Sequence, residues 1–306
     1  MQNYILIVFI GLALSLGLTL LIMPHYIKLL KALHYEQRVS EYALEEYKNK
    51  AQTPIMGGAL FVVIPVIVFG VINLSHLLDP DIIMIIMAYV LFFIIGFLDD
   101  ILIIIRQNNE GLSPKLKMAM EVLCAVFLGF FFLKDASTFV TIPFTNIDIN
   151  LPHILYVLLV IFMYCAESNA VNFTDGMDGL CAGVSFIAFL PFLVLAFKEG
   201  EYDIALFIIL VLAALIGYLR FNFFPAKIFM GDSGSLLLGY VLSTASVLGL
   251  FKMYTLVAFA VPVLTLALPL TDTVFAVVRR VSRGESPFHA DRGHIHHRLL
   301  ALGLTQ

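Results

Sequence analysis

The stretch from Glu167 to Leu180, ESNAVNFTDGMDGL, concentrates polar residues that could do chemistry, and apolar runs stand on both sides of it. Its polar members include two amides and two carboxylates: Asn169, Asn172, Asp175 and Asp178. The last three are spaced by three residues, so on a helical turn their side chains would share one face. Carboxylates and amides beside glycines can meet a metal ion, phosphates or a polar heterocycle.

A second pair of acids, Asp99 and Asp100, lies near the end of a long apolar run that continues to Ile105 before Arg106. An ionised carboxylate about one to two turns inside an apolar segment is costly. Two adjacent acids at that depth need a cation or hydrogen-bond donors, so the sequence predicts a functional pair. The alternative is a helix-end pair whose side chains reach water.

The motif MGDSGS places Asp232 between glycines, directly before an apolar run that starts at Leu236. Small residues and exposed N–H groups at the start of a helix suit phosphate, and the helix dipole adds to the attraction. A carboxylate there suits Mg²⁺, which binds carboxylate and phosphate oxygens. The alternative is simple N-capping by Asp232 or Ser233.

Near the C-terminal end, a compact cationic segment holds three histidines between two arginines: Arg292, His294, His296, His297 and Arg298. Zinc is one interpretation, but no cysteine or second ligand cluster supports it. Phosphate binding fits better, because arginine and partly protonated imidazole both donate to oxyanions. A solvated basic segment resting near anionic lipid is the alternative.

Composition decides which elements must position these residues. The chain has 306 residues, of which 61% are hydrophobic, and it contains repeated apolar runs long enough to cross about 30 Å of hydrocarbon. We predict an all-α, polytopic helical membrane protein that forms one integral domain over residues 1–306. About nine spans are expected: 4–23, 56–74, 82–105, 116–133, 152–166, 181–197, 203–219, 235–251 and 256–279. The first apolar run is long enough to remain as a span rather than a cleaved signal.

The loops between these spans alternate in charge. Of the 18 lysines and arginines, all but Lys134, Lys198 and Lys252 fall on one side, which leaves fifteen there. The positive-inside rule assigns that side to the cytoplasm. All the polar motifs described above lie on the same side, so a cytoplasm-facing active site is expected. The three cysteines show no metal-binding or disulfide spacing, and we expect free thiols.

Four motifs in this order resemble the polyprenyl-phosphate N-acetylhexosamine-1-phosphate transferases: GFLDD (96–100), NAVNFTDGMDGL (169–180), PAKIFMGDSGSL (225–236) and DRGHIHHRL (291–299). The resemblance covers nearly the whole chain. It implies transfer of a sugar-1-phosphate from a UDP-N-acetylamino-sugar to a polyprenyl (undecaprenyl) phosphate, with Mg²⁺ as cofactor and UMP as product. It also implies a bacterial plasma membrane location and a fold that usually has ten helices. A homodimer is left open.

Two parts of the chain point to different donors within that family. QTPIMGG (52–58) and GLSPKLK (111–117) look like the members that transfer phospho-N-acetylmuramoyl-pentapeptide in peptidoglycan synthesis. The segment 269–300 is more similar to the members that transfer N-acetylglucosamine-1-phosphate at the start of teichoic acid or O-antigen synthesis. We expect the muramoyl-pentapeptide donor and keep N-acetylglucosamine as the alternative.

The resemblance and the chemistry together suggest a role for each residue. Asp232 is the expected Mg²⁺ ligand. Asp175 and Asp178 would position the uridine side of the donor, with Asn172 nearby and Phe229 stacked on uracil. Lys117 and the histidine segment would neutralise phosphate oxygens. Asp99 or Asp100 would orient the acceptor for direct attack, with a role for one of them as base or covalent nucleophile as the alternative.

A different class of function, an ion-coupled transporter, would use intramembrane carboxylates as an ion relay. Transporters place such sites near the midplane between inverted repeats. In this sequence the acids gather toward one face, and no inverted repeat is visible. The transferase hypothesis is therefore favoured over the transporter.

Overall fold

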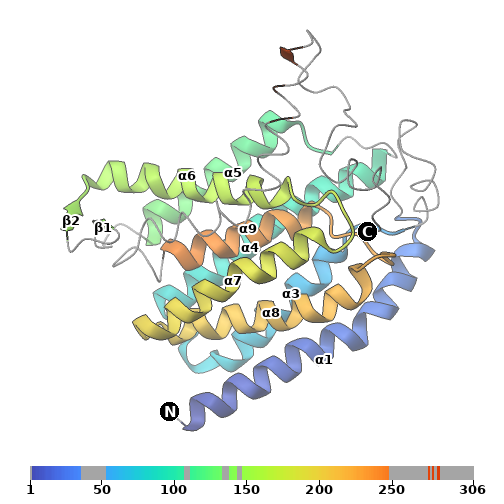
Figure 1. The fold of residues 1–306 in the computed structure, drawn as a ribbon, viewed down its shortest axis with the longest axis horizontal. Helices are drawn as coiled ribbons and strands as arrows, with labels where there is room; N and C mark the ends of the chain where they lie inside the picture. Colours follow the sequence, from blue (N-terminus) through green and yellow to red (C-terminus); the bar gives the residue numbers. More distant parts are fainter. Residues whose placement is uncertain are drawn as a thin grey trace.

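The computed structural model describes residues 2–35, 53–106, 111–132, 138–142 and 147–247, together with positions 275, 278, 281 and 282. The described chain is mainly helical (Figure 1). Its helices are α1 (Gln2–Ala32), α3 (Gly57–Ile72), α4 (Pro80–Arg106), α5 (Pro114–Phe132), α6 (His153–Asn172), α7 (Leu180–Glu199), α8 (Tyr202–Asn222) and α9 (Asp232–Ala245). A single 3-10 turn, η1 (Leu74–His76), follows α3.

Each of the first eight predicted spans coincides with one of these helices, which confirms the all-α membrane architecture over the described residues. Five helices are long and apolar enough to cross a membrane: α1 (from Tyr4), α4, α6, α7 and α8. α3 is a shorter apolar helix, and α9 has 14 residues within the described part. The ninth predicted span, 256–279, lies outside the described residues apart from positions 275 and 278.

A short hairpin between α5 and α6 was not predicted from the sequence. Strand β1 (Phe139–Ile142) pairs antiparallel with β2 (Ile147–Asn150), and Phe139 lies opposite Asn150. β-branched residues are frequent in both strands, as in Val140, Thr141 and Ile149, and such residues favour extended structure. The strands are too short to give a sequence signal comparable to that of a membrane span.

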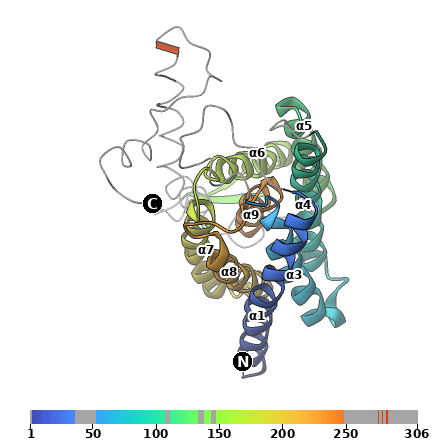
Figure 2. The same ribbon diagram turned by 90° about the vertical axis from the view of Figure 1, so that its right-hand side faces the viewer.

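Helix α9 forms the centre of the bundle. It packs against α3, α4, α6 and α7, and Figure 2 shows it enclosed by these neighbours while α1 lies at the edge. Every residue from Ser233 to Ala245 is buried. By contrast, only 17% of the apolar window in α1 is buried, as expected for a helix whose outer face meets lipid. The first residues of the motif GDSGS are therefore held at the start of an enclosed helix.

The contact between α9 and α6 requires a glycine. A Cβ atom added at Gly239 of α9 would collide with the backbone of Glu167 and Ser168 on α6. The two backbones can approach this closely only because Gly239 has no side chain. The small residue therefore sets the distance between the central helix and the helix that carries the Asn169–Asn172 motif.

We predict that Gly239→Ala will lower the thermal unfolding midpoint of the detergent-solubilised protein. Overpacking of a close helix contact typically costs about 1–3 kcal/mol. Gly183→Ala on α7 is the matched control, because nothing lies within 4 Å of a Cβ at that position. Circular dichroism at 222 nm (the helical signal) during heating provides the measurement. Equal midpoints for the two variants would contradict the prediction.

Candidate active site

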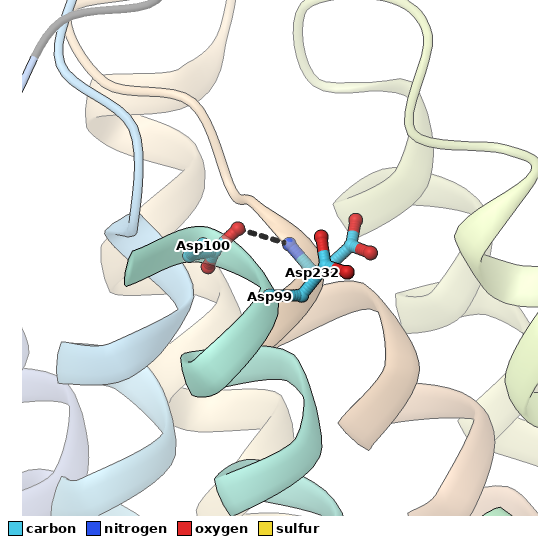
Figure 3. A group of neighbouring side chains, drawn as sticks. All are labelled: Asp99, Asp100 and Asp232. Atoms are coloured by element: carbon cyan, nitrogen blue, oxygen red, sulfur yellow. Dashed lines mark hydrogen bonds between the residues drawn. The ribbon is translucent and has the colours of Figure 1, made fainter. Parts of the chain in front are cut away.

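Three carboxylates meet at one end of the bundle. Asp99 and Asp100 lie in the last two turns of α4, and Asp232 is the first residue of α9 (Figure 3). One oxygen from each lies within 4.8 Å of the others. Asp99 is 6% exposed and Asp100 is 2% exposed. Both acids are buried and both accept hydrogen bonds from backbone N–H groups, and their functional role stays a prediction.

Asp100 caps the first turn of α9 from a neighbouring helix. Its Oδ1 accepts the N–H of Asp232 at 2.9 Å, and its Oδ2 accepts the N–H of Ser233 at 3.0 Å. The residue before α9, Gly231, has no side chain that could supply this cap. A carboxylate is especially favourable at this position because the helix N-terminus carries partial positive charge. Both oxygens of Asp100 are thus used to hold the start of α9.

This arrangement corrects both interpretations of MGDSGS, namely phosphate binding by exposed N–H groups and N-capping by Asp232 or Ser233. The cap comes from Asp100 and not from Asp232 or Ser233. The first two N–H groups of α9 are occupied by that carboxylate, and those of Gly234 and Ser235 bond to the Gly231 carbonyl. They are therefore not free to bind phosphate. The sequence could not show this, because the cap is a contact between residues 132 positions apart.

Asp99 points to a different neighbour. Its Oδ1 accepts the N–H of Leu112 at 2.8 Å, and a Cβ at Gly111 would collide with its carboxyl group. Residues 111 and 112 lead directly into α5, so Asp99 helps to place the start of that helix. The GLSPKLK motif is thereby brought to the end of α4, as the clustering of motifs on one side had predicted.

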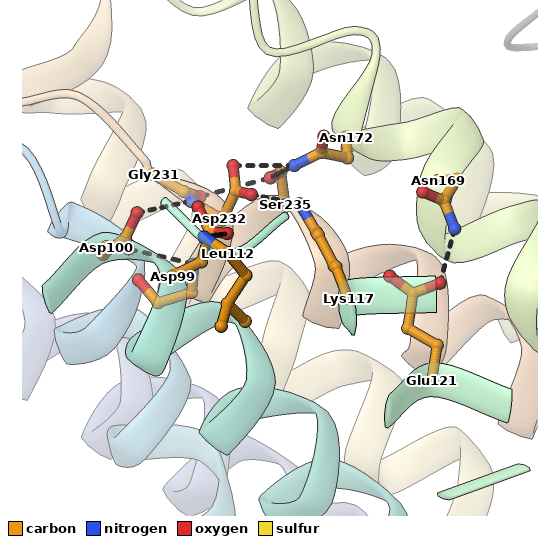
Figure 4. Close-up of polar contacts among 11 residues, drawn as sticks. Asp99, Asp100, Leu112, Lys117, Glu121, Asn169, Asn172, Gly231, Asp232 and Ser235 are labelled. Carbon is orange, nitrogen blue, oxygen red and sulfur yellow. Dashed lines mark hydrogen bonds and ion pairs between the residues drawn. The ribbon is translucent and has the colours of Figure 1, made fainter. Parts of the chain in front are cut away.

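Asp232 is the hub of polar contacts in the site (Figure 4). Its Oδ2 forms an ion pair with Lys117 of α5, and its Oδ1 accepts a hydrogen bond from the Asn172 amide at 2.9 Å. The same amide nitrogen donates to the Ser235 hydroxyl at 2.8 Å. The side chain of Asp232 is 26% exposed and that of Lys117 is 14% exposed. Asp232 is thus partly accessible, whereas Asp100 is enclosed.

Asn172, Asp175 and Asp178 do not share one helical face, contrary to the expectation from their spacing. Helix α6 ends at Asn172, and residues 173–179 form turns that finish at Gly179 with φ 73°. The glycines of the motif favour such turns, which end the helix. Asn172 consequently faces Asp232, whereas the two aspartates face the loop before α9.

The two aspartates shape this second loop. Asp178 Oδ2 accepts the N–H of Ala226 at 3.0 Å, and the Gly231 backbone bonds to Asp175. Burial raises the pKa of Asp175 to about 7, and the negative charge of Asp232 acts in the same direction. The Asp175 carboxyl can therefore exist in either protonation state near neutral pH, so it can donate as well as accept hydrogen bonds.

Asn222, which the sequence analysis did not single out, joins the two loops. This buried amide at the end of α8 accepts the N–H of Gly179 at 3.0 Å and donates to the Ile228 carbonyl at 2.9 Å. Its position in the sequence could have indicated a role, because Asn222 is an amide at the end of an apolar span, directly before FFPAK (223–227). It fixes the loop that carries Asp178 against the loop that carries Phe229.

Phe229 is held by its backbone. Its N–H donates to the Pro54 carbonyl at 2.8 Å, and its own carbonyl accepts the N–H of Gly57 at 2.8 Å. Gly58 extends the pairing by donating to the Met230 carbonyl. The QTPIMGG motif therefore holds the loop backbone at Phe229 and Met230, and the Phe229 side chain is half-buried. Its proposed contact with uracil stays a prediction.

Glu121 of α5 and Asn169 of α6 form a further polar pair beside Lys117 (Figure 4). Asn169 was noted within its motif, but Glu121 was not predicted as a site residue. The signal that could have found it is the four-residue spacing from Lys117, which places both on one face of a helix. The predicted phosphate-binding residues Arg292, His294, His296 and His297 lie outside the described residues.

The described residues fit a divalent cation. Asp99, Asp100 and Asp232 bring three carboxylates together, and the Lys117 ammonium contacts Asp232. Hard cations such as Mg²⁺ prefer carboxylate oxygen ligands. Asp232 and Asp99 are the residues that would hold the ion, since two N–H groups already bond to Asp100 and it is the most buried of the three. The ion would offset the excess negative charge.

The fold and site define a polytopic helical membrane protein with three carboxylates and a lysine gathered at one end of its bundle. The chain belongs to glycosyl transferase family 4, whose sequence profile matches residues 82–250. It is similar to the phospho-N-acetylmuramoyl-pentapeptide-transferase of Staphylococcus saprophyticus, with 35% identity over 281 residues that cover 90% of this chain and 87% of the relative. The protein of the same name from Anoxybacillus flavithermus is 34% identical over 92% of this chain and 86% of its own length. A Staphylococcus aureus protein of that name is 37% identical over 79% and 76%.

We predict that Asp100→Ala will destabilise the protein more than Asp99→Ala. The first change leaves two backbone N–H groups at the buried start of α9 without a partner, at about 1–3 kcal/mol for each unsatisfied group. The second change removes the acceptor of only one N–H group, that of Leu112. Thermal unfolding of both purified variants in detergent measures the difference. An equal or larger loss in Asp99→Ala would show that Asp100 does not have the capping role.

Proposed function

We propose that this protein transfers phospho-N-acetylmuramoyl-pentapeptide from its UDP-linked donor to a polyprenyl phosphate, producing lipid I for peptidoglycan synthesis and releasing UMP. The relatives that cover most of the chain carry the name of this activity. The observation that carries the proposal in the structure is the meeting of Asp99 and Asp232 with Lys117 beside a capped helix start. Positioning and charge neutralisation are what phosphoryl transfer requires.

The reaction exchanges one phosphate linkage for another. An oxygen of the acceptor phosphate attacks the donor phosphorus that bears the sugar. The bond from that phosphorus to the oxygen bridging to UMP then breaks, and UMP leaves with the bridging oxygen. A phosphate monoester has a second pKa of about 6, so the acceptor is already mostly dianionic at neutral pH. A general base is not required, and we favour direct attack.

Each acid then has its own role. Asp232, with Asp99 beside it, is the proposed ligand of Mg²⁺, which when bound would supply positive charge to the phosphates. Asp100 is a positioning residue, because both of its oxygens hold α9. A role for Asp100 as nucleophile or base would compete with those bonds for its oxygen lone pairs. Lys117 is proposed to neutralise phosphate oxygens.

The remaining proposed roles concern the nucleotide end of the donor. The loop bearing Asp175 and Asp178 faces the loop bearing Phe229, and Asn222 ties the two together. We propose that uridine binds between them with uracil on the Phe229 ring. Asn172 would then link this region to Asp232. The basic segment at 292–298 is proposed to contact donor phosphate, on the grounds of its sequence alone.

Donor identity is tested with purified protein, undecaprenyl phosphate and Mg²⁺. Release of UMP is measured with UDP-N-acetylmuramoyl-pentapeptide and, separately, with UDP-N-acetylglucosamine. We expect turnover with the first donor. Turnover with only the second would replace the proposed substrate by the alternative donor within the same family. Absence of UMP release with both would leave the transferase proposal without support and reopen the transporter hypothesis.

We predict that Asp232→Asn will abolish Mg²⁺-dependent turnover, because the change removes the one partly exposed carboxylate at the centre of the site. The variant should remain folded, since the amide can still accept a hydrogen bond from Asn172. Activity is measured across a range of Mg²⁺ concentrations, and folding by thermal unfolding. Near-normal activity at saturating Mg²⁺ would remove Asp232 as the essential ligand.

The site is proposed to face the cytoplasm of a bacterial cell, in agreement with the distribution of basic residues. We predict that a cysteine at Gly176 will react with a membrane-impermeant thiol reagent in inside-out vesicles but not in spheroplasts. Gly176 is exposed in the loop before α7, and nothing lies within 4 Å of its Cβ position. Lys198→Cys, at the opposite end of α7, is the matched control and should react in spheroplasts. The unmodified chain gives the background of its own three cysteines.

A further inference from the structure

Glu121 is a buried carboxyl group whose bonding is incomplete. It lies one helical turn beyond Lys117 on α5 and is 0% exposed. Its Oε2 accepts a hydrogen bond from the Asn169 amide (Figure 4). Its Oε1 is buried and has no hydrogen-bond partner among the described residues. A buried carboxyl oxygen without a hydrogen-bond partner is costly, which suggests that Glu121 has a functional role.

Asn169 cannot satisfy this second oxygen. Its Nδ2 donates both to Glu121 and to the Cys165 carbonyl, the latter at 2.9 Å. An amide nitrogen carries two hydrogens, so both donors of Asn169 are in use. The amide is therefore fixed, and Oε1 of Glu121 remains an open acceptor beside the site.

Lys117 is the nearby cation on the same helical face. Residues four positions apart on a helix are neighbours, and the charges of Lys117 and Glu121 act on each other. In the structure, the Lys117 ammonium contacts Asp232 Oδ2. The proposed function places a divalent cation at this same carboxylate. An ammonium and a dication on one carboxylate repel each other strongly in a partly buried site.

We propose that Glu121 receives the Lys117 ammonium when a divalent cation occupies Asp232. Lysine has a flexible four-carbon stem and three donors, so a rotation of its outer bonds can exchange one carboxylate partner for another. Oε1 of Glu121 then gains the partner that it lacks, and Asp232 becomes free to bind the ion. Lys117 remains close to the ion, where donor phosphate would arrive. This inference rests on the metal site of the proposed function.

Glu121→Gln separates this role from simple support of Asn169. Glutamine keeps a carbonyl oxygen that can accept from the Asn169 amide, but it carries no negative charge for the lysine. Glu167→Gln is the matched control. Glu167 is also a buried acid, 5% exposed, and its Oε2 accepts from Ser243 on α9 at 3.0 Å.

The experiment measures Mn²⁺ binding to the purified protein without substrate, by the loss of the free-ion signal in electron paramagnetic resonance. We expect Glu121→Gln to weaken Mn²⁺ binding about tenfold, a change that corresponds to about 1.4 kcal/mol. Glu167→Gln should bind as tightly as the unmodified protein. Lys117→Met should bind Mn²⁺ more tightly, because it removes the competitor. Adding Glu121→Gln to Lys117→Met should have no further effect.

The outcomes are distinguishable. Unchanged binding in Glu121→Gln, or the same loss with and without Lys117, would overturn the inference while leaving the metal site intact. If Glu121→Gln does not fold, Lys117→Met alone decides, since weaker or unchanged Mn²⁺ binding in that variant would also overturn it. Asp232→Asn tests the underlying site, and unimpaired Mn²⁺ binding there would refute the proposed metal ligand itself.

Discussion

The bond between the Asp100 carboxylate and the first two N–H groups of α9 is the constraint on which the site depends. It joins the end of one helix to the beginning of another, at a position where the chain itself supplies only Gly231 as a cap. Gly96, one turn before Asp100 on α4, makes the approach possible, because a side chain there would collide with the backbone of Asp232 and Ser233. The cap from Asp100 therefore fixes the backbone of Asp232.

Acids of the same type consequently have separate tasks. Asp100 is buried and bonded to backbone N–H groups, whereas Asp232 is partly exposed and bonded to the side chains of Lys117 and Asn172. Asp99 holds the segment that leads into α5, and Asp178 holds the loop before α9. Asp100 therefore builds the site through its backbone contacts, whereas the carboxylate of Asp232 meets side-chain donors from neighbouring helices.

The sequence predicted the helices well and the local contacts poorly. Eight apolar runs coincide with described helices because the cost of exposing polar backbone to lipid leaves little choice of structure. The convergence of GFLDD, GLSPKLK and GDSGS on one end of the bundle followed from the alternation of loops. Three contacts could not be predicted, because each depends on which faces of distant helices meet. They are the cap from Asp100, the two bonds by which Asn222 joins its loops, and the pairing of Glu121 with Asn169. The equal spacing of Asn172, Asp175 and Asp178 was misleading, since the glycines among them end the helix.

The complete enclosure of α9 affects how the protein responds to its bilayer. A helix that meets lipid must tilt or adjust when the hydrocarbon thickness changes, and α1, with most of its surface outward, is the element that would do so. Helix α9 is buried from Ser233 to Ala245, so its position is set by α3, α4, α6 and α7. The position of Asp232 at the start of α9 therefore depends on contacts with protein rather than with lipid, so a change in bilayer thickness would leave the arrangement of the three carboxylates unaltered.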